Sequence, residues 1–237
     1  MFKNKYQNKK ILAIIPARGK SKRLPNKNVR IMARKPLIAH TIFSAQKSKY
    51  INRIVISTED KKITEISRKY GAEVVKRPKS LAKDNTQIKE VVSNVLEVLE
   101  KEKYIPELIV ILQPTSPLRN EVDIDEAIEN FLKNENKCKV SMSVCEIKYP
   151  SSWLFKDGGK LLKSLFIYDF LSGNRQDKEK IYVPNGAIYI IKLKTFKRNK
   201  TLVSKKILPY FMPKEKIIDI DDELDFNITE RLMKKEL

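Results

Sequence analysis

The sequence is short of the residues that common nucleotide-binding motifs require. Only six of its 237 residues are glycine, and no G-x-G-x-x-G run occurs, which excludes the dinucleotide-binding fingerprint. Gly19, Lys20 and Ser21 match the end of a phosphate-binding P-loop, but the glycine needed five residues before Gly19 is replaced by Ile14. The P-loop is therefore excluded as well.

Cysteine and histidine are equally scarce. Cys138 and Cys145 lie seven residues apart on a predicted strand, whose period of two sends them to opposite faces. We expect neither a disulfide nor a paired metal site, and we interpret both residues as core or surface thiols. The single histidine, His40, falls in a predicted helix and is interpreted as structural.

Long apolar runs are also missing. No segment approaches the ~18 apolar residues that a membrane-spanning helix needs. The first ten residues, MFKNKYQNKK, lack the apolar stretch of a signal peptide. We therefore expect a cytoplasmic protein with no membrane partner.

Acidic residues are in deficit. The chain carries 49 Lys and Arg against 29 Asp and Glu, a formal charge of +20. Such an excess is compatible with nucleic-acid binding, with small polyanionic substrates, or with a lysine-rich composition that serves no ligand. Acidic side chains alternate with the cations in residues 56–69 and 89–103, which is typical of solvated helix faces. We therefore expect no nucleic-acid partner.

Short apolar runs alternate with amphipathic segments along most of the chain. This alternation predicts the α/β class, as a single domain spanning residues 1–237 with a three-layer α/β/α sandwich around a mainly parallel central sheet. The predicted strands are 10–15, 53–58, 72–78, 107–113, 139–147, 185–191 and 217–221. The predicted helices are 36–48, 60–71, 86–101, 121–134 and a last one that runs to about residue 235.

The alternation breaks between residues 148 and 184. This stretch contains Gly158, Gly159 and Gly173 together with several aromatic residues, and we interpret it as an insertion with a Gly-Gly hairpin. An aromatic-rich insertion is typical of a dimer contact or a lid, and a loosely packed loop is the alternative. The residues alone leave these possibilities open.

Residues 14–28, IIPARGKSKRLPNKN, place five cations directly after the first predicted strand. Ligands of open α/β sheets bind at the carboxyl ends of the strands, where this loop begins. Arginine offers bidentate phosphate contacts and lysine offers point charges, so the loop fits a triphosphate. A solvated basic loop without a ligand is the alternative. The five cations are Arg18, Lys20, Lys22, Arg23 and Lys27.

Asp219 and Asp221 alternate with isoleucines near the end of the chain. If residues 217–221 form a strand, both carboxylates project from one face. This arrangement suits Mg²⁺, which takes few protein ligands and leaves its remaining positions to water and phosphate. The alternative is that Asp221 or Asp222 caps the helix that follows.

Six motifs spread over almost the entire chain occur in a recognisable order. They are PARGKSKRLPNKN, RIVISTED, EVVKRPKSLAKDNT, ILQPTSPLR, PNGAIYI and IIDIDDELDF. In this order they resemble the acylneuraminate cytidylyltransferases, also called CMP-sialic acid synthetases. The resemblance implies a nucleotide-diphospho-sugar transferase-like fold and a homodimer. It also implies that CTP, with Mg²⁺ or Mn²⁺, reacts with a nine-carbon 2-keto sugar acid whose anomeric hydroxyl attacks the α-phosphate and expels pyrophosphate.

The resemblance also implies roles for individual residues. It assigns charge stabilisation on the triphosphate to Arg18 and Lys27, and it favours metal binding over helix capping for Asp219 and Asp221; these four form the predicted catalytic set. The predicted nucleotide-binding residues are Arg18, Gly19, Ser21, Lys27, Asn28, Arg77, Asp84, Thr86 and Gln87. The predicted sugar-binding residues are Gln113, Arg175, Gln176, Asn185, Gly186 and Tyr189, of which Arg175 and Gln176 reach into the partner's site from a dimerisation insertion at 148–184.

The chain departs from the family pattern at several positions. Lys20 and Arg23 stand where glycines are usual, and Val183 stands where some sialic acid enzymes have arginine. Ser152 or Trp153 replaces a lysine region, and we expect Trp153 either to stack on a sugar or to pack in the dimer contact. These departures leave open whether the acid is of neuraminic, legionaminic or pseudaminic type.

Two alternative functions remain at this point. One is activation of the eight-carbon acid KDO, whose enzymes share a similar basic loop, although PNGAIY and IDIDDELDF argue against it. The other is a non-catalytic nucleotide-binding protein of the same fold. Arg119 is left outside the predicted site as an exposed loop cation.

Overall fold

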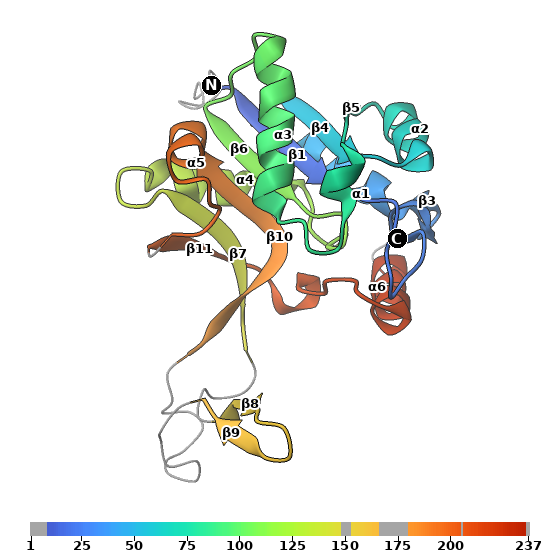
Figure 1. Ribbon diagram of the computed structural model, residues 1–237, viewed down its shortest axis with the longest axis vertical. Coiled ribbons are helices and arrows are strands. Elements are labelled where there is room, and N and C mark those ends of the chain that lie inside the picture. The colour runs from blue at the N-terminus through green and yellow to red at the C-terminus, as the bar shows by residue number, and fades with distance from the viewer. Residues whose placement is uncertain (1–8, 148–152, 166–179, 205, 236–237) are drawn as a thin grey trace.

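The computed structural model describes residues 9–147, 153–165, 180–204 and 206–235 (Figure 1). Seven strands form one sheet: β1 (Ile11–Pro16), β4 (Arg53–Thr58), β5 (Glu73–Lys76), β6 (Leu108–Leu112), β7 (Val140–Glu146), β10 (Tyr182–Lys192) and β11 (Ile207–Phe211). Their order is β11-β7-β10-β6-β1-β4-β5. Within the described part of the chain, β10 alone runs antiparallel to its neighbours in this sheet. The predicted, mainly parallel sheet is confirmed.

Helices cover both faces of this sheet. Along β1, the side chains of Ile11, Ala13 and Ile15 pack on one face, whereas Leu12 and Ile14 pack on the other, and all five are fully buried. This alternation is the strand period of two, applied to a strand that is buried on both sides. The first face carries α1 (Leu37–Lys47), α2 (Lys61–Lys69) and α4 (Glu121–Lys133), and the second carries α3 (Ile88–Lys101) and α5 (Leu193–Asn199). The predicted three layers are confirmed.

A third, smaller apolar cluster lies beside the sheet. It joins Leu24 of the basic loop, Leu37 of α1, Ile220, and Phe226 of α6 (Glu223–Lys235), together with Met32 and Ala33. The short strands β2 (Ile31–Met32) and β3 (Lys35–Pro36) form a tight turn there. We call these six residues the loop cluster. It fixes the last helix of the chain against the loop that follows the first strand.

The stretch after β7 leaves the body of the molecule. Its described part includes an antiparallel hairpin of β8 (Phe155–Asp157) and β9 (Leu162–Ser164), which lies well apart from the central sheet in Figure 1. Gly159 turns the chain with a φ of 87°, a conformation that glycine adopts without strain. The predicted Gly-Gly hairpin is therefore present, and its part in dimerisation stays a prediction.

The structure overturns the predicted strand at 217–221. This segment is irregular: Ile220 donates its N–H to the carbonyl of Thr115 at 2.9 Å, but within the described residues no strand continues the ladder. The alternation of the sequence nevertheless survives, because Ile220 is fully buried while Asp219 and Asp221 stay exposed. One buried anchor side chain is enough to impose that pattern without a sheet.

Two smaller predictions also need correction. Cys138 precedes β7 and does not lie on it, although both cysteines are free thiols as expected. Strand β11 was not predicted, since Pro209 within it disfavours a strand; the structure places it at the edge of the sheet, where proline is tolerated. Among the described helices, none combines the length and apolar character needed to cross a bilayer.

The α4 face of the core provides a test of the layered packing. Phe131 of α4 is fully buried against the sheet, so Phe131→Ala should lower the free energy of unfolding by about 3–5 kcal/mol. Val122 on the same helix is 53% exposed, so Val122→Ala should change stability by less than ~0.5 kcal/mol. Urea denaturation measures both. Similar losses in the two variants would contradict the packing of α4 described above.

Candidate active site

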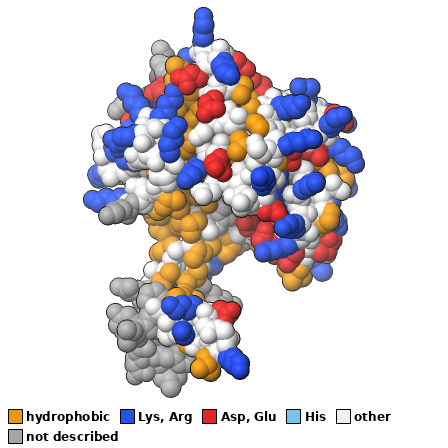
Figure 2. Space-filling model, viewed as in Figure 1, with side chains coloured by type: hydrophobic (Ala, Val, Ile, Leu, Met, Phe, Trp, Pro, Cys, Tyr) orange, Lys and Arg blue, Asp and Glu red, His pale blue; other side chains and the backbone are white. Residues whose placement is uncertain are grey.

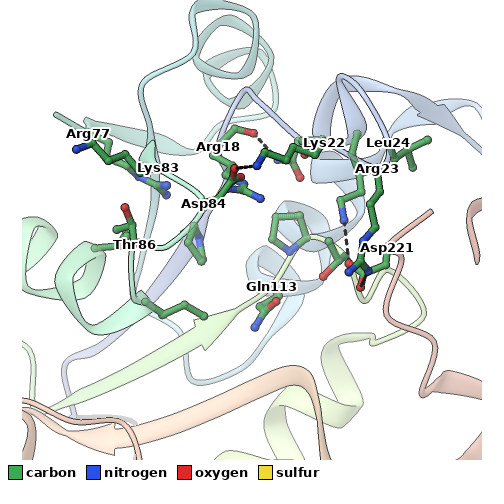
Figure 3. A pocket seen from close by; sticks show the side chains of 18 of the residues that line it. Arg18, Lys22, Arg23, Leu24, Arg77, Lys83, Asp84, Thr86, Gln113 and Asp221 are labelled. Atoms are coloured by element: carbon green, nitrogen blue, oxygen red, sulfur yellow. Dashed lines mark hydrogen bonds and ion pairs between the residues drawn. The ribbon is translucent and has the colours of Figure 1, made fainter. Parts of the chain in front are cut away.

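A cleft of about 470 Å³ opens at the carboxyl end of the central sheet. Its walls come from the loop after β1, the segment between β5 and α3, and the loop after β6 (Figure 3). Open α/β sheets bind ligands at this edge. The cleft is lined by nine of the residues predicted for the site: Arg18, Ser21, Lys27, Asn28, Arg77, Asp84, Thr86, Gln113 and Asp221.

The basic loop is held from inside by its own short side chains. Leu24 is buried in the loop cluster, and the Asn28 side-chain amide donates to the carbonyl of Arg18 at 2.9 Å. Asn26 takes a left-handed conformation with a φ of 57°, which asparagine tolerates better than most residues. The loop therefore has a defined shape although it carries few glycines.

Gly19 is the position of this loop where a side chain does not fit. Its N–H donates to Glu59 Oε1 at 2.8 Å, which draws the backbone against the start of α2. A Cβ placed on Gly19 would lie 2.5 Å from Oδ2 and 2.8 Å from Cβ of Asp60. Asp60 cannot easily move away, because its side chain accepts the Ile63 N–H as the N-cap of α2.

Lys27 is the most enclosed cation of the loop. It is only 9% exposed, its ammonium donates to the carbonyl of Ile220, and it lies 3.7 Å from Asp221 Oδ1. Desolvation lowers the pKa of Lys27, and the charge of Asp221 opposes that shift. The lysine thus depends on neighbouring anions for its charge, and a bound phosphate would supply a further one.

Arg18 and Lys22 are held by one carboxylate across the cleft. Asp84 accepts from Arg18 and from Lys22, both at 2.6 Å, and these two cations lower the pKa of Asp84, with Lys22 contributing more. The side chain of Arg18 is 34% exposed, that of Lys22 is 80% exposed and that of Asp84 is 46% exposed. Exposed ion pairs contribute little to stability, so an incoming polyanion can replace Asp84 at small cost.

Asp219 and Asp221 lie opposite these cations. Asp221 pairs with Arg23 at 2.9 Å. Asp219 keeps contact with solvent, but surrounding protein raises its pKa by desolvation, and the negative charge of Asp221 adds to that shift. A Cβ on Gly186 would lie 3.5 Å from both Asp219 Oδ2 and Gln113 Nε2, which places these groups side by side.

Helix capping, the alternative given for Asp221 or Asp222, is carried out by Asp222. Asp222 Oδ1 accepts the N–H of Asp225 at 3.0 Å in the first turn of α6. The Asp225 carboxylate in turn accepts the N–H of Asp221 at 2.9 Å. The Asp221 side chain remains directed at the cleft (Figure 3).

Two carboxylates on this wall can hold a hard cation. Among the described residues, no group of three or more His, Cys, Asp and Glu side chains gathers as a complete metal cage. Mg²⁺ does not need one, since it keeps several waters and takes oxygens from a bound nucleotide. The pKa of Asp219 is raised mainly by desolvation and further by the charge of Asp221, so a cation beside the two acids would be favourable.

The predicted nucleotide-binding residues after β5 behave differently from one another. Arg77 is 5% exposed and donates to the Ser57 hydroxyl (3.1 Å) and carbonyl (2.7 Å); desolvation lowers its pKa. It ties the ends of β4 and β5 together while still lining the cleft. Thr86 lines the cleft as well, but Gln87 does not: its N–H is bonded by Glu90 at 2.9 Å at the start of α3.

Among the predicted sugar-binding residues, some lie at or beside the cleft and one is buried in the core. Gln113 lines the cleft, and Gly186, at a φ of 79°, sits directly beside it. Asn185 is buried, and its amide is used within the core by the Ser143 hydroxyl (2.5 Å) and Met212 Sδ (3.0 Å). Tyr189 has its pKa raised by burial and by Asp219. Arg175 and Gln176 lie outside the described residues.

Comparison with known proteins identifies the family. The model of a family described as cytidylyltransferase matches residues 12–219. The CMP-N,N'-diacetyllegionaminic acid synthase of Legionella pneumophila is 37% identical over 226 residues, covering 94% of this chain and 96% of that protein. The chain belongs to the cytidylyltransferase family. It is therefore a nucleotidyltransferase, and the resemblance found in its sequence is confirmed.

Further relatives of this cytidylyltransferase differ in their sugar. The N-acylneuraminate cytidylyltransferase of Escherichia coli O18:K1:H7 is 34% identical over 226 residues; the match covers 95% of this chain but 52% of that longer protein. The pseudaminic acid cytidylyltransferase of Campylobacter jejuni serotype O:23/36 is 31% identical, with 95% and 97% covered.

Solved structures agree in fold. A CMP-2-keto-3-deoxy-manno-octonic acid synthetase in complex with CTP has a TM-score of 0.69 at 16% identity and covers 96% of this chain and 100% of its own. The 4-diphosphocytidyl-2C-methyl-D-erythritol synthase of Anaerococcus prevotii has a TM-score of 0.63 at 15% identity, covering 95% and 99%. At these identities the likeness concerns the fold alone.

Some residues around the cytidylyltransferase cleft were given no role from the sequence. Lys22 and Arg23 were counted among the loop cations without an assignment, and Lys83 and Thr115 were missed; all four line the cleft. Arg119 is not the exposed loop cation that was expected: it is fully buried, and it donates to the Thr41 hydroxyl at 2.8 Å. Burial lowers the pKa of Arg119 to about 10. The apolar and proline residues around it in the run PTSPL were the only local signal of that burial.

Substitution of Gly19 tests the shape of the basic loop. Gly19→Ala should lower kcat/KM for CTP by roughly 100-fold, because the new Cβ pushes the loop and its cations away from Asp60. Asp60→Gly removes the atoms that the Cβ meets. The double variant should therefore lose much less activity relative to Asp60→Gly alone. A purely additive result would show that the contact with Asp60 is not the reason for a glycine at this position.

Proposed function

We propose that this cytidylyltransferase activates a nonulosonic acid with CTP. The anomeric hydroxyl oxygen of a nine-carbon 2-keto sugar acid bonds to the α-phosphorus as the bond to the β-phosphate oxygen breaks, giving the CMP-sugar and pyrophosphate. The observation that carries this proposal is the meeting of Arg18, Lys22 and Lys27 with Asp221 in one cleft at the carboxyl end of β1, with Asp219 close enough to Lys27 to interact with its charge. The names of the relatives at 31–37% identity support the sugar class.

The cations act on the triphosphate. Arg18 and Lys27 neutralise the oxygens around the α-phosphate and the departing pyrophosphate, and Lys22 adds a mobile charge at the mouth of the cleft. Asp84 gives up its two ion pairs as the nucleotide enters. Ser21 supplies a neutral hydrogen bond to the phosphate, whereas Asn28 and Gly19 fix the shape of the loop through their bonds to the Arg18 carbonyl and to Glu59.

Asp219 and Asp221 are the residues that would hold Mg²⁺ or Mn²⁺. The bound ion supplies charge neutralisation of the triphosphate oxygens. Arg23 shares Asp221 in the nucleotide-free protein, but its side chain is 72% exposed and such a pair is readily exchanged. The ammonium of Lys27 lies between the carbonyl of Ile220 and the Asp221 carboxylate. Its positive charge is therefore kept next to the negative charge of Asp221.

The remaining predicted residues are assigned to the cytidine of CTP and to the sugar acid. Arg77, Thr86 and the residues around Gln87 hold the cytidine. Gln113, Gly186 and Tyr189 face the sugar, and Asn185 supports that wall from inside the core. Arg175 and Gln176, which belong to the segment outside the described residues, are proposed to reach the partner subunit's site.

We further propose a homodimer built on the insertion at 148–184. Tyr182, Val183 and Phe211 are 39%, 39% and 56% exposed at the base of this excursion, and the rings of Tyr182 and Phe211 are in contact at 4.9 Å. Figure 2 shows hydrophobic surface continuing from the body toward the excursion. A second copy of the chain covers this surface in the proposal. The enzyme is expected to act in the cytoplasm, where CTP is made.

Two rivals remain. The eight-carbon acid is supported by the similar basic loop of its enzymes, and its structural neighbour at 16% identity shares the fold alone, whereas relatives at 31–37% identity carry nonulosonic acid names. A nucleotide-binding protein without turnover is the second rival. It is disfavoured by the presence of both the phosphate-facing cations and the paired acids.

Pyrophosphate release tests the proposal directly. With CTP and Mg²⁺ present, we expect release only when a nonulosonic acid is added, across a panel of neuraminic, legionaminic, pseudaminic and eight-carbon acids. Activity with the eight-carbon acid alone would favour the first rival. CTP binding by calorimetry without release for any acid would favour the second.

Asp221→Ala tests the metal assignment. Mg²⁺-dependent turnover should fall by at least ~100-fold while the fold is retained, because the substituted side chain is exposed at the cleft. Asp222→Ala is the matched control: it removes a neighbouring carboxylate that caps α6, and it should cost about 1 kcal/mol of stability but keep the Mg²⁺ dependence. Undiminished turnover of Asp221→Ala would remove Asp221 from the metal site.

A further inference from the structure

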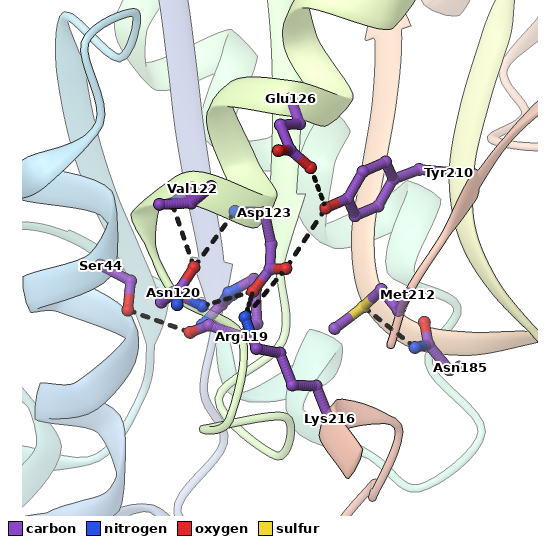
Figure 4. Close-up of polar contacts among 10 residues, drawn as sticks. All are labelled: Ser44, Arg119, Asn120, Val122, Asp123, Glu126, Asn185, Tyr210, Met212 and Lys216. Atoms are coloured by element: carbon purple, nitrogen blue, oxygen red, sulfur yellow. Dashed lines mark hydrogen bonds and ion pairs between the residues drawn. The ribbon is translucent and has the colours of Figure 1, made fainter. Parts of the chain in front are cut away.

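A buried polar network lies at the start of α4, outside the cleft (Figure 4). At its centre, Asp123 accepts from Lys216 at 2.9 Å, from the N–H of Asn120 at 2.9 Å and from the Tyr210 hydroxyl at 3.2 Å. The Asp123 side chain is 4% exposed and that of Lys216 is 19% exposed. These four residues come from the loop after β6, from α4, from β11 and from the 3-10 turn that follows β11.

The network is nearly balanced in charge. Tyr210 also hydrogen-bonds Glu126 at 3.0 Å, and the burial of its hydroxyl between two acids raises its pKa. Arg119, fully buried close by, supplies a second positive charge near Asp123. Buried charges in such a cluster are costly to leave unpaired, so each fixes the position of its partner.

Lys216 connects this network to the acids of the cleft. It ends the 3-10 turn at Lys214–Lys216, and Asp219 and Asp221 follow three and five residues later in the irregular segment 217–222. Beyond Lys216 the segment is fixed by Ile220, which is buried in the loop cluster, donates its N–H to the carbonyl of Thr115 at 2.9 Å and accepts from Lys27. Asp219 lies between these two fixed points.

We propose that the Lys216–Asp123 ion pair is a positioning device that holds segment 217–222, and with it the Asp219 and Asp221 carboxylates, against the cleft. Neither Lys216 nor Asp123 lines the cleft, so both act through the segment. Without the pair, the segment loses its polar anchor on the Lys216 side. It keeps the packing of Ile217, the contact of Asp219 with Thr115 and the attachment at Ile220, so the distance from Asp219 to Asp221 is less tightly fixed. Looser carboxylates bind a divalent cation less tightly, as happens when the outer partners of metal ligands are removed. This last step rests on the proposed function.

The test uses the full-length chain and two readouts. The first is amide hydrogen exchange of peptides covering residues 214–222, compared with peptides from β1 and β6. The second is Mn²⁺ affinity measured by electron paramagnetic resonance in the absence of the sugar acid. The variants are Lys216→Met, Lys216→Arg and the double variant Asp123→Asn/Lys216→Met, which removes both charges of the pair. Lys192→Met is the matched control, because Lys192 forms a similar pair with Glu135 (2.8 Å, 29% and 25% exposed) elsewhere.

We expect both Lys216→Met and the double variant to exchange faster in 214–222 but not in β1 or β6, and to bind Mn²⁺ roughly tenfold more weakly. Lys216→Arg should restore much of the slow exchange and much of the Mn²⁺ affinity. Lys192→Met should change neither quantity. If Lys216→Met fails to fold, the double variant decides.

Unchanged exchange in 214–222 would overturn the proposal. So would faster exchange with unchanged Mn²⁺ affinity, since positioning would then have no consequence for the acids. If the unsubstituted protein binds no Mn²⁺, the metal assignment of the proposed function fails, and the positioning of the segment is decided by the exchange result alone.

Discussion

Burial of Leu24 and Ile220 in the same apolar cluster is the constraint on which the cleft depends. Leu24 belongs to the loop after the first strand and Ile220 to the segment before the last helix. Their packing therefore joins two parts of the chain that are almost its whole length apart in sequence. On either side of Leu24 lie the cations Arg23 and Lys27, and beside Ile220 lies Asp221. Packing of two apolar residues thus brings opposite charges together at a distance in sequence that no local interaction could bridge.

The charges that meet there are arranged to be exchanged. Arg18 and Lys22 are neutralised by Asp84, and Arg23 by Asp221, through pairs that remain open to water and therefore contribute little to stability. Lys27 and Arg77 are different, because burial and hydrogen bonds to the Ile220 carbonyl and to Ser57, respectively, hold them in place. The cleft combines these fixed cations with others that can turn toward a polyanion.

The sheet was predictable because its signals are local, whereas the nine predicted residues that line the cleft were assigned through the resemblance to a family. Apolar runs such as ILAIIP and LIVIL indicate strands buried on both faces, and the motif of the basic loop indicates its ligand class. Segment 217–221 was predicted wrongly since an alternation of isoleucine and aspartate is the same for a strand and for an irregular segment with one buried anchor. The burial of Arg119 and the Lys216–Asp123 pair arise from residues distant in sequence, which a single chain without its fold cannot pair.

The excursion after β7 is closed at its base by the sheet itself. Glu146 of β7 is opposite Tyr182 of β10, and the next residue, Ile147, donates its N–H to the carbonyl of Ile181 at 2.9 Å. The excursion therefore begins and ends at adjacent paired residues of β7 and β10. A change in the length of this element need not shift the register of β7 and β10, so the edge of the sheet that carries the cleft is insulated from such a change.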